Sequence, residues 1–544
     1  MLFIQEYNPL NNWLLSTVAA ALPLLLVFFL LAFRRTAGHW AALWALVCAC
    51  LLAVLLWGLP PASALAALGL GASFGLFPVV WIVISAVWIY NMTVESGNFE
   101  IIKSALAKLT ADRRIQALLI AFSFGAFLEG TSGFGAPVAI SAAMLAGLGF
   151  QRLYAAALCL IANTAPVGFA ALGIPVLVAA SVSDLEVMRV SQMLGRQLSI
   201  LALIVPLWLC VIMCGWRKSL QVWPAWLICG LSAGGAQLLM SNLHGPALAS
   251  VASALASLLG IIILLRFWQP RTIWRFAHEH TPSETAAPGY SALQIARAFS
   301  PFILLACLVF LWGLADIKLL LNRLFMMEIN WPLLHNLVAQ APPLNAGHTP
   351  LKAVYTLNLA SSGGSAALVA GLLAALVMGN YSLKKAVVCL ARTTYQLRFP
   401  ILNIMAFLGL GYLLNYSGMS STLGLAFTNT GMLFALFAPV IGWLGVFLTG
   451  SDTSSNALFG GIQKTTALAT GLDPVLTVAA NSAGGDTGKM ISPQSLAVAT
   501  AASGMVGQEG SLFRFALPHS IAMLLMVCLL IWAQAYWIPW MIPD

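Results

Sequence analysis

Hydrophobic residues along the chain fall into runs that are each long enough to cross a lipid bilayer. A membrane-spanning helix needs about 20 consecutive apolar residues. The first run covers 12–33, and the others lie near 38–58, 66–92, 153–180, 192–215, 221–240, 246–268, 295–316, 360–379, 397–416, 475–500 and 515–540. The pattern predicts an all-α polytopic membrane protein with about 12 transmembrane helices.

Two further apolar stretches, near 115–150 and 428–470, are each interrupted by a short polar segment. The first contains EGTSGFG at 129–135 and the second contains TGSDTSSN at 449–456. Non-helical backbone at membrane depth is tolerated only where it is buried in protein or lines a cavity. We expect each stretch to form a re-entrant hairpin, and two ordinary spans joined by a short loop remain the alternative.

The composition supports a membrane location for the whole chain. Hydrophobic residues make up 61% of the 544 positions and charged residues only 8%, against roughly 25% charged residues in a soluble domain. So few charges cannot cover a soluble surface, which excludes soluble enzymes, secreted domains and nucleic-acid-binding proteins. The nine cysteines lie in or beside apolar runs without metal-ligand spacing, so neither a metal nor a cofactor is expected.

The positions of Lys and Arg predict the orientation. Threading the spans and hairpins places 18 of the 25 basic residues on one side, which identifies that side as the cytoplasm. The first helix then starts outside. It has no positive charge before it and is followed by Arg34 and Arg35, so we expect a retained transmembrane helix rather than a cleaved leader.

The chain also contains a weak internal repeat, with four landmarks in the same order and spacings that agree within two residues. The pairs are Ser96-Gly97 with Ser417-Gly418, GAFLEG (125–130) with GVFLTG (445–450), Asn163-Thr-Ala165 with Asn481-Ser-Ala483, and Pro175 with Pro493. The threading gives the two copies opposite orientations. Inverted repeats with broken helices are typical of secondary transporters, whose binding sites form between the repeats.

This organisation divides the chain into four segments. We expect an N-terminal transmembrane helix (1–36), a first inverted repeat (37–265), a linker with one transmembrane helix and an external loop (266–358), and a second inverted repeat (359–544). Breaks are predicted in the helices after the hairpins, at 163–166 and 481–488. Pro166 cannot donate to a helical ladder, and the pair Gly484-Gly485 favours unwinding.

The two tips and two breaks supply the candidate substrate-binding residues. Free N–H groups and positive dipole ends of half-helices suit a carboxylate, and hydroxyl and amide side chains add hydrogen bonds. The candidates are Gly130, Thr131, Ser132, Asn163, Thr164, Ser451, Thr453, Ser454, Asn456, Asn481 and Ser482. The competing interpretation is that these side chains only satisfy nearby backbone or hold helices together.

Ionisable residues inside the membrane are expensive and therefore indicate function more sharply. Glu129 and Asp452 occupy nearly equivalent places in the two tips. Burial favours the neutral form of a carboxylic acid, so either residue could carry a proton. Lys489 could hold a substrate carboxylate or pair with Asp486, and for Lys464 a structural role is favoured. All seven histidines map to loops or helix ends, which argues against a His-based proton relay.

Three segments resemble the signature segments of the bacterial L-lactate permease family. They are FGAFLEGTSGFGAPVA (124–139), FLTGSDTSSNAL (447–458) and GKMISPQS (488–495), and the resemblance extends over essentially the whole chain. It implies a multi-pass transporter of the bacterial inner membrane that takes up L-lactate, and often D-lactate and glycolate, together with protons.

We therefore predict proton-coupled uptake of short 2-hydroxymonocarboxylates, with Glu129 taking the proton and Asp452 as the second candidate. The expected partners are the substrate, protons and membrane lipid, and a homo-oligomer is left open. A sodium-coupled carboxylate transporter, with Asp452 and tip carbonyls holding the ion, is the first alternative. A channel is a further alternative. A membrane enzyme using 316–358 is disfavoured, because that segment lacks metal-ligand or nucleophile spacing.

Overall fold

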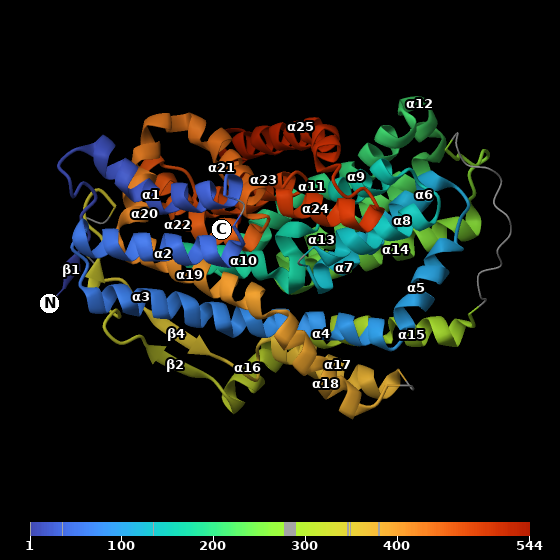
Figure 1. Ribbon diagram of the computed structural model, residues 1–544, viewed down its shortest axis with the longest axis horizontal. Coiled ribbons are helices and arrows are strands. Elements are labelled where there is room, and N and C mark those ends of the chain that lie inside the picture. The colour runs from blue at the N-terminus through green and yellow to red at the C-terminus, as the bar shows by residue number, and fades with distance from the viewer. Residues whose placement is uncertain are drawn as a thin grey trace.

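The computed structural model consists almost entirely of helices packed side by side (Figure 1). It describes residues 2–34, 36–133, 135–276, 290–344, 347–348, 350–378 and 381–544. The predicted all-α membrane architecture is confirmed. Of the predicted linker, residues 277–289 lie outside the described part of the chain.

The N-terminal part contains four helices. They are α1 (Trp13–Ala32), α2 (Gly38–Leu55), α3 (Pro61–Phe74) and α4 (Trp81–Glu95), with a π-helical turn η1 (Gly75–Val80) between the last two. Because η1 joins α3 to α4, the segment from Pro61 to Glu95 forms one candidate span of 35 residues.

The first predicted repeat continues with shorter helices around the first tip. Its elements are α5 (Asn98–Ala107), α6 (Arg113–Ala117), η2 (Leu118–Phe124), α7 (Gly125–Thr131), α8 (Ala136–Gly147), α9 (Arg152–Ala162), η3 (Val167–Phe169), α10 (Ala170–Ser183), α11 (Val187–Cys214), α12 (Trp216–Ser219), η4 (Leu220–Val222), α13 (Trp223–Leu243), η5 (Pro246–Leu248) and α14 (Ala249–Phe267).

The middle of the chain holds two helices and most of the little β-structure. The elements are α15 (Ala292–Gly313), α16 (Ala315–Leu324), β2 (Met327–Asn330), β3 (Val338–Ala339) and β4 (Val354–Leu357). Strand β2 pairs with β4 in antiparallel fashion, and β3 pairs in parallel with β1 (Phe3–Ile4). The N-terminal segment is thereby fixed to the loop that the sequence places outside.

The second predicted repeat forms the C-terminal part. Its elements are α17 (Gly363–Val377), α18 (Leu383–Gln396), α19 (Arg398–Ser417), α20 (Met419–Ala426), η6 (Phe427–Leu433), α21 (Phe434–Thr449), α22 (Asp452–Thr470), α23 (Pro474–Lys489), α24 (Pro493–Ser503), α25 (Glu509–Tyr536) and η7 (Pro539–Met541).

The landmarks of the internal repeat occupy equivalent places in this helix order. Gly97 and Gly418 both follow a long helix and precede a short one, with φ angles of 76° and 95° that favour glycine. Helices α11 and α25, which follow the two helix breaks, each have 28 residues. The inverted orientation of the copies and the boundaries of the four segments stay predictions.

Ten helices of the described chain are long and apolar enough to cross a membrane, or eleven if the bent pair α9–α10 counts as one span. The predicted spans at 360–379 and 475–500 are absent from this set. The first corresponds to the 15-residue helix α17. The second is divided between α23 and α24.

One predicted break lies elsewhere. The break at 163–166 is present, and the two arms of this pair, Arg152–Ala162 and Val167–Ser183, meet at an angle of 61°. The break predicted at 481–488 is wrong, because α23 continues through that segment and ends only at Lys489. Its glycines allow close packing instead: a Cβ at Gly484 would overlap the carbonyl of Pro439 on α21, and one at Gly488 would overlap that of Trp443.

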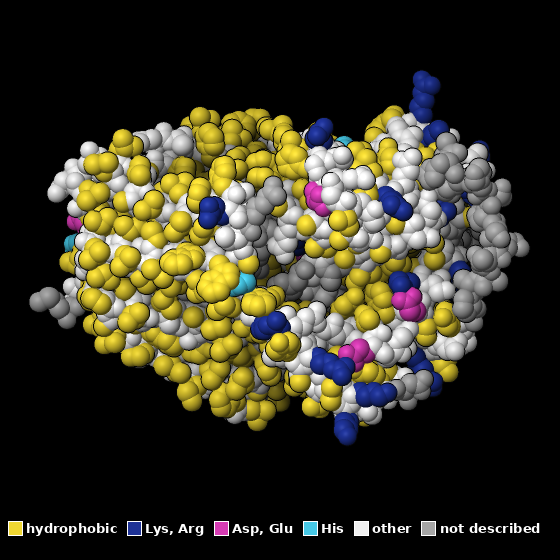
Figure 2. All heavy atoms as spheres, viewed as in Figure 1, with side chains coloured by type: hydrophobic (Ala, Val, Ile, Leu, Met, Phe, Trp, Pro, Cys, Tyr) yellow, Lys and Arg dark blue, Asp and Glu magenta, His cyan; other side chains and the backbone are white. Residues whose placement is uncertain are grey.

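The outer surface agrees with a membrane location. Figure 2 shows an almost continuous hydrophobic surface over the half that holds α1, α2 and α19, while charged side chains gather over the other half. Large apolar side chains such as Leu14, Leu55 and Trp44 are exposed there. In a chain with ten candidate spans, this surface is the one that contacts lipid.

Candidate functional site

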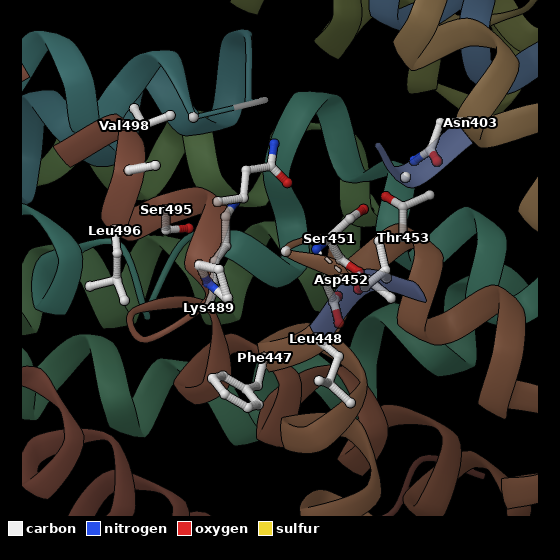
Figure 3. A pocket seen from close by; sticks show the side chains of 18 of the residues that line it. Asn403, Phe447, Leu448, Ser451, Asp452, Thr453, Lys489, Ser495, Leu496 and Val498 are labelled. Carbon is white, nitrogen blue, oxygen red and sulfur yellow. Dashed lines mark hydrogen bonds between the residues drawn. The ribbon is translucent and has the colours of Figure 1, made fainter. Parts of the chain in front are cut away.

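A cavity of about 960 Å³ lies between the two predicted repeats. Both tips line it, the first through Gly133 and Gly135 and the second through 450–453. Both helix breaks line it as well, at 167–171 and at 491–495. Figure 3 shows Ser451, Asp452 and Thr453 on one side of the cavity and the segment from Lys489 to Ser495 on the other. Both predicted tips and the residues that follow the predicted first break therefore meet at the cavity, together with the segment after α23, whereas the predicted break at 481–488 does not line it.

Three helices begin at this cavity. Helix α8 follows Gly135, α22 follows its N-cap residue Ser451, and α24 starts at Pro493. Each helix start presents N–H groups without intrahelical partners and the positive end of the helix dipole. These helix starts contribute a positive potential at the cavity, next to the acidic side chains that also line it.

The first break has an unusual backbone. Ala171, Leu172 and Gly173 follow one another with φ angles of 44°, 60° and 80°, so α10 starts with a left-handed turn. A non-glycine residue in this region costs roughly 1–2 kcal/mol. Such strain persists only where the surroundings hold it and is found at functional sites. Ala171 lines the cavity, so the strained turn forms part of its wall.

A buried ion pair joins the two repeats across the cavity. Lys489 Nζ donates to Glu129 Oε1 at 2.7 Å. Glu129 is fully buried and its Oε2 has no hydrogen-bond partner among the described residues. Lys489 is the one Lys or Arg among the described residues that line the cavity. The pair with Glu129 replaces the pair with Asp486 that the sequence left open.

Behind the second tip, amide side chains form a buried network. Asn456 Nδ2 donates to Asp452 Oδ2 (3.3 Å), to Ser482 Oγ (2.6 Å) and to the carbonyl of Pro175 in the first repeat (3.1 Å). Asn481 Nδ2 donates to Asn456 Oδ1 at 2.8 Å, and Gln463 Nε2 donates to Asn481 Oδ1 at 3.1 Å. The network holds α22 and α23 together and fixes the carboxylate of Asp452.

The predicted site residues fall into two groups. Those that line the cavity are Glu129, Ser451, Asp452, Thr453 and Lys489. The others lie behind the wall: Thr131, Ser132 and Thr164 donate to carbonyls of their own helical turns, Gly130 packs on α14, Ser454 is buried in α22, Asn163 is buried beside the first break, and Asn456, Asn481 and Ser482 form the network.

The sequence did not single out several residues of the cavity wall. His39 and Asn403 line it from α2 and α19, and Gln494 and Ser495 line it from the start of α24. His39 was placed at a helix end and set aside, and its ring stacks on Phe399 with a centroid distance of 4.8 Å. The sequence signals for Gln494 and Ser495 are their position directly after Pro493 and their place in the signature segment GKMISPQS (488–495).

The cavity opens at one end. Ala32, Phe399 and Gly510 line it and are exposed. They lie within four residues of Arg34, Arg398 and Arg514, which the charge distribution assigns to the cytoplasm. Outside the cavity lining, Lys464 Nζ approaches Asp184 Oδ2 at 3.8 Å, and Asn415 Nδ2 donates to the carbonyl of Val182 at 2.7 Å, which ties α22 and α19 to the end of α10.

Comparison with known proteins gives a consistent result. The family described as L-lactate permease matches residues 16–538. The L-lactate permease of Bacillus subtilis is 46% identical over the full length of both chains, and that of Escherichia coli K12 is 45% identical over the full length of both. The glycolate permease GlcA of Escherichia coli K12 is 44% identical over 98% of each chain.

Among solved structures, the YdaH transporter of Alcanivorax borkumensis aligns over 86% of each chain with a TM-score of 0.45 and 16% identity. The sequence comparisons are much stronger, because they extend from end to end at well above 30% identity. This chain is a multi-pass membrane transporter and not an enzyme, and it belongs to the L-lactate permease family.

Proposed function

We propose that this protein takes up L-lactate and related short 2-hydroxymonocarboxylates, such as D-lactate and glycolate, across the bacterial cytoplasmic membrane by proton symport. Membership of the L-lactate permease family and the names of its relatives support the substrate class. The observation that carries the proton coupling is the buried pair of Glu129 and Lys489 in the cavity.

This pair links substrate binding to proton binding because the carboxylate of Glu129 and the carboxylate of the substrate compete for the same ammonium group of Lys489. While Glu129 is ionised, it neutralises Lys489 and occupies its ammonium group. A proton on Glu129 removes that competitor, and Lys489 can then hold the carboxylate of the substrate. Counted over Glu129, Lys489 and the substrate, the empty site and the site with both substrate and proton carry the same net charge.

A carrier with only one of the two ligands is at a disadvantage. Substrate alone adds an unpaired negative charge to a buried site, and a proton alone leaves an unpaired positive charge on Lys489. A buried charge without a partner costs several kcal/mol. The empty and the fully loaded forms are therefore the ones that reorient, which is the condition for symport.

The helix starts complete the site. The N–H groups at the beginnings of α22 and α24 lie on the same cavity as Lys489 and suit the second oxygen of the carboxylate. Thr453, Gln494 and Ser495 offer hydroxyl and amide groups for the 2-hydroxyl of the substrate. Ser451 already accepts the Ser454 N–H at 3.3 Å and keeps its own hydroxyl proton to donate.

Uptake of labelled L-lactate into liposomes that contain only this protein tests the proposal. With an inward pH gradient and no sodium, we expect accumulation above equilibrium that a protonophore abolishes. Accumulation that requires sodium would replace the proton mechanism by ion coupling. Equilibration without accumulation would indicate a channel.

The variant Glu129→Gln tests the role of the ion pair. An amide cannot bind the coupling proton but leaves Lys489 free for substrate. The variant should exchange internal for external lactate and should lose accumulation driven by a pH gradient. Glu186→Gln, which changes an exposed acid before α11, is the matched control and should behave like the unaltered protein. Unchanged accumulation in Glu129→Gln would remove Glu129 from the coupling role.

A further inference from the structure

The interior of the protein contains more buried acids than cations. Glu129, Asp452 and Asp486 are all buried, and Lys489 makes its ion pair with Glu129. In the described part of the chain, neither Asp452 nor Asp486 has an ion-pair partner, and one oxygen of each (Oδ1) has no hydrogen-bond partner. Two ionised carboxylates in this position would be strongly unfavourable, so at least one of them must hold a proton.

The surroundings of the two aspartates differ. Asp452 is the first residue of α22, where the helix dipole favours a negative charge, and it lines the cavity. Asp486 lies in the last turn of α23, where the dipole disfavours a negative charge, and it is fully buried away from the cavity lining. The proton therefore belongs on Asp486 and the charge on Asp452.

Among the described residues, no cation from a neighbouring element pairs with Asp486. The charged groups that face it are Asp452, Glu129 and Lys489, the last already held by Glu129. Helix α21 carries no ionisable side chain.

The other charged groups and the histidine on the helices packed on α23 lie away from Asp486 or are engaged elsewhere. On α11, Arg189 approaches Asp473, and Arg196 donates to Asn242 and to the carbonyl of Met541. On α22, Lys464 approaches Asp184. On α25, Glu509 accepts from Thr500 and from the N–H of Gly507, Arg514 is exposed, and His519 packs against Trp208 and Phe515.

Asp486 also contacts the turn η3 that follows the first helix break. Its Oδ2 accepts the N–H of Gly168 in this turn at 2.9 Å. The neighbours Val167 and Ala170 line the cavity. Asp452, which lines the cavity, packs against the residue before Asp486, because its Oδ1 lies 2.7 Å from the place of a Cβ at Gly485.

We propose that Asp486 binds a second proton, delivered from the cavity through Asp452, so that each 2-hydroxy acid enters with two protons and one net positive charge. The proton adds to the free Oδ1 of Asp486, and Oδ2 keeps the hydrogen bond from Gly168. After the acid has left on the cytoplasmic side, rearrangement of the break changes the surroundings of Asp486 and releases this proton, so that the carrier returns outward with Asp486 ionised and accepting the N–H of Gly168. The structure, in which Asp486 holds the proton, precedes this release. This inference rests on the proton symport proposed above.

The dependence of transport on membrane potential tests the second proton. One proton per lactate anion moves no net charge, whereas two protons move one positive charge inward. In proteoliposomes without a pH gradient, an inside-negative potential of about 60 mV, set by potassium and valinomycin, should raise the limiting accumulation of lactate about tenfold. Uptake that responds to a pH gradient but not to the potential would overturn the second proton and leave symport intact. Uptake that responds to neither would overturn the symport itself.

The variant Asp486→Asn tests whether the second transported proton binds to Asp486. The amide keeps an oxygen for the Gly168 N–H but cannot take up a proton. Accumulation driven by the potential should fall to the equilibrium level, while accumulation driven by a pH gradient persists. Glu186→Gln serves again as the control and should keep the tenfold response. If Asp486→Asn responds to the membrane potential as strongly as the unaltered protein, Asp486 does not bind the second proton. If the variant does not fold, the measurement on the unaltered protein still decides the number of protons per acid.

Discussion

Replacing Lys489 by methionine removes the only described partner of a fully buried carboxylate. Glu129 loses its 2.7 Å contact, and no other hydrogen bond to its oxygens replaces it. Breaking a buried pair in this way costs about 3–5 kcal/mol. With an unfolding entropy of ~2.1 cal/mol/K per residue, the 544 residues convert this cost into a drop of about 3–4 °C in the unfolding temperature.

Removing the unpaired carboxylate as well should reverse most of this loss. The double variant Glu129→Gln, Lys489→Met contains no buried charge at this position and should recover most of the stability at pH 8.

Thermal unfolding of detergent-solubilised protein, at one scan rate and at pH 8, measures these differences. Lys464→Met is the matched control, because Lys464 pairs with an Asp184 side chain that is 97% exposed. Loss of an exposed pair is worth less than about 1 kcal/mol. The reasoning is refuted if Lys489→Met unfolds within a degree of the unaltered protein at pH 8, or if the double variant unfolds no later than Lys489→Met.

Three further results are expected. Gly484→Ala should push α23 away from the Pro439 carbonyl and cost about 1–3 kcal/mol of stability. Gly510→Ala is the control and should change stability by less than about 1 kcal/mol, because the added methyl group enters open space. Equal unfolding temperatures of the two variants would contradict the close packing at Gly484. Asn456→Ala should cost about 1–3 kcal/mol, because its partners in the network lose their donor, and an unchanged unfolding temperature would show that the network is not stabilising. A cysteine at Gln494, in a background without native cysteines, should react with an impermeant thiol reagent in inside-out vesicles at least about tenfold faster than in right-side-out vesicles; the reverse preference would invert the orientation.

Much of the architecture could be predicted from local patterns. Runs of apolar residues identify the helices, and Gly97 and Gly418 mark equivalent helix ends because few other residues adopt a positive φ. The polar tips were found because Glu129 and Asp452 are costly inside a membrane. In each case a local physical constraint leaves a local mark in the sequence.

Other features depend on distant parts of the chain. The partner of Lys489 is 360 residues away, and no periodicity or spacing connects it to Glu129. The misplaced break at 481–488 has a different cause. Glycine permits both unwinding and close helix packing, and local sequence does not separate the two. The spacing of Gly484 and Gly488, four residues apart, was the available signal for packing.

The volume of the cavity bears on how the protein selects its cargo and how it can be blocked. About 960 Å³ is close to the upper end of the range for drug-sized molecules, and a three-carbon acid fills only a small part of it. The open cavity therefore cannot select substrates by size, and such selection requires the walls to contract around the bound acid. A carboxylate with a long apolar tail could enter from the open end, with its acid at Lys489 and its tail along Phe399, Phe447 and Phe513. Such a compound would prevent contraction and act as an inhibitor rather than a cargo.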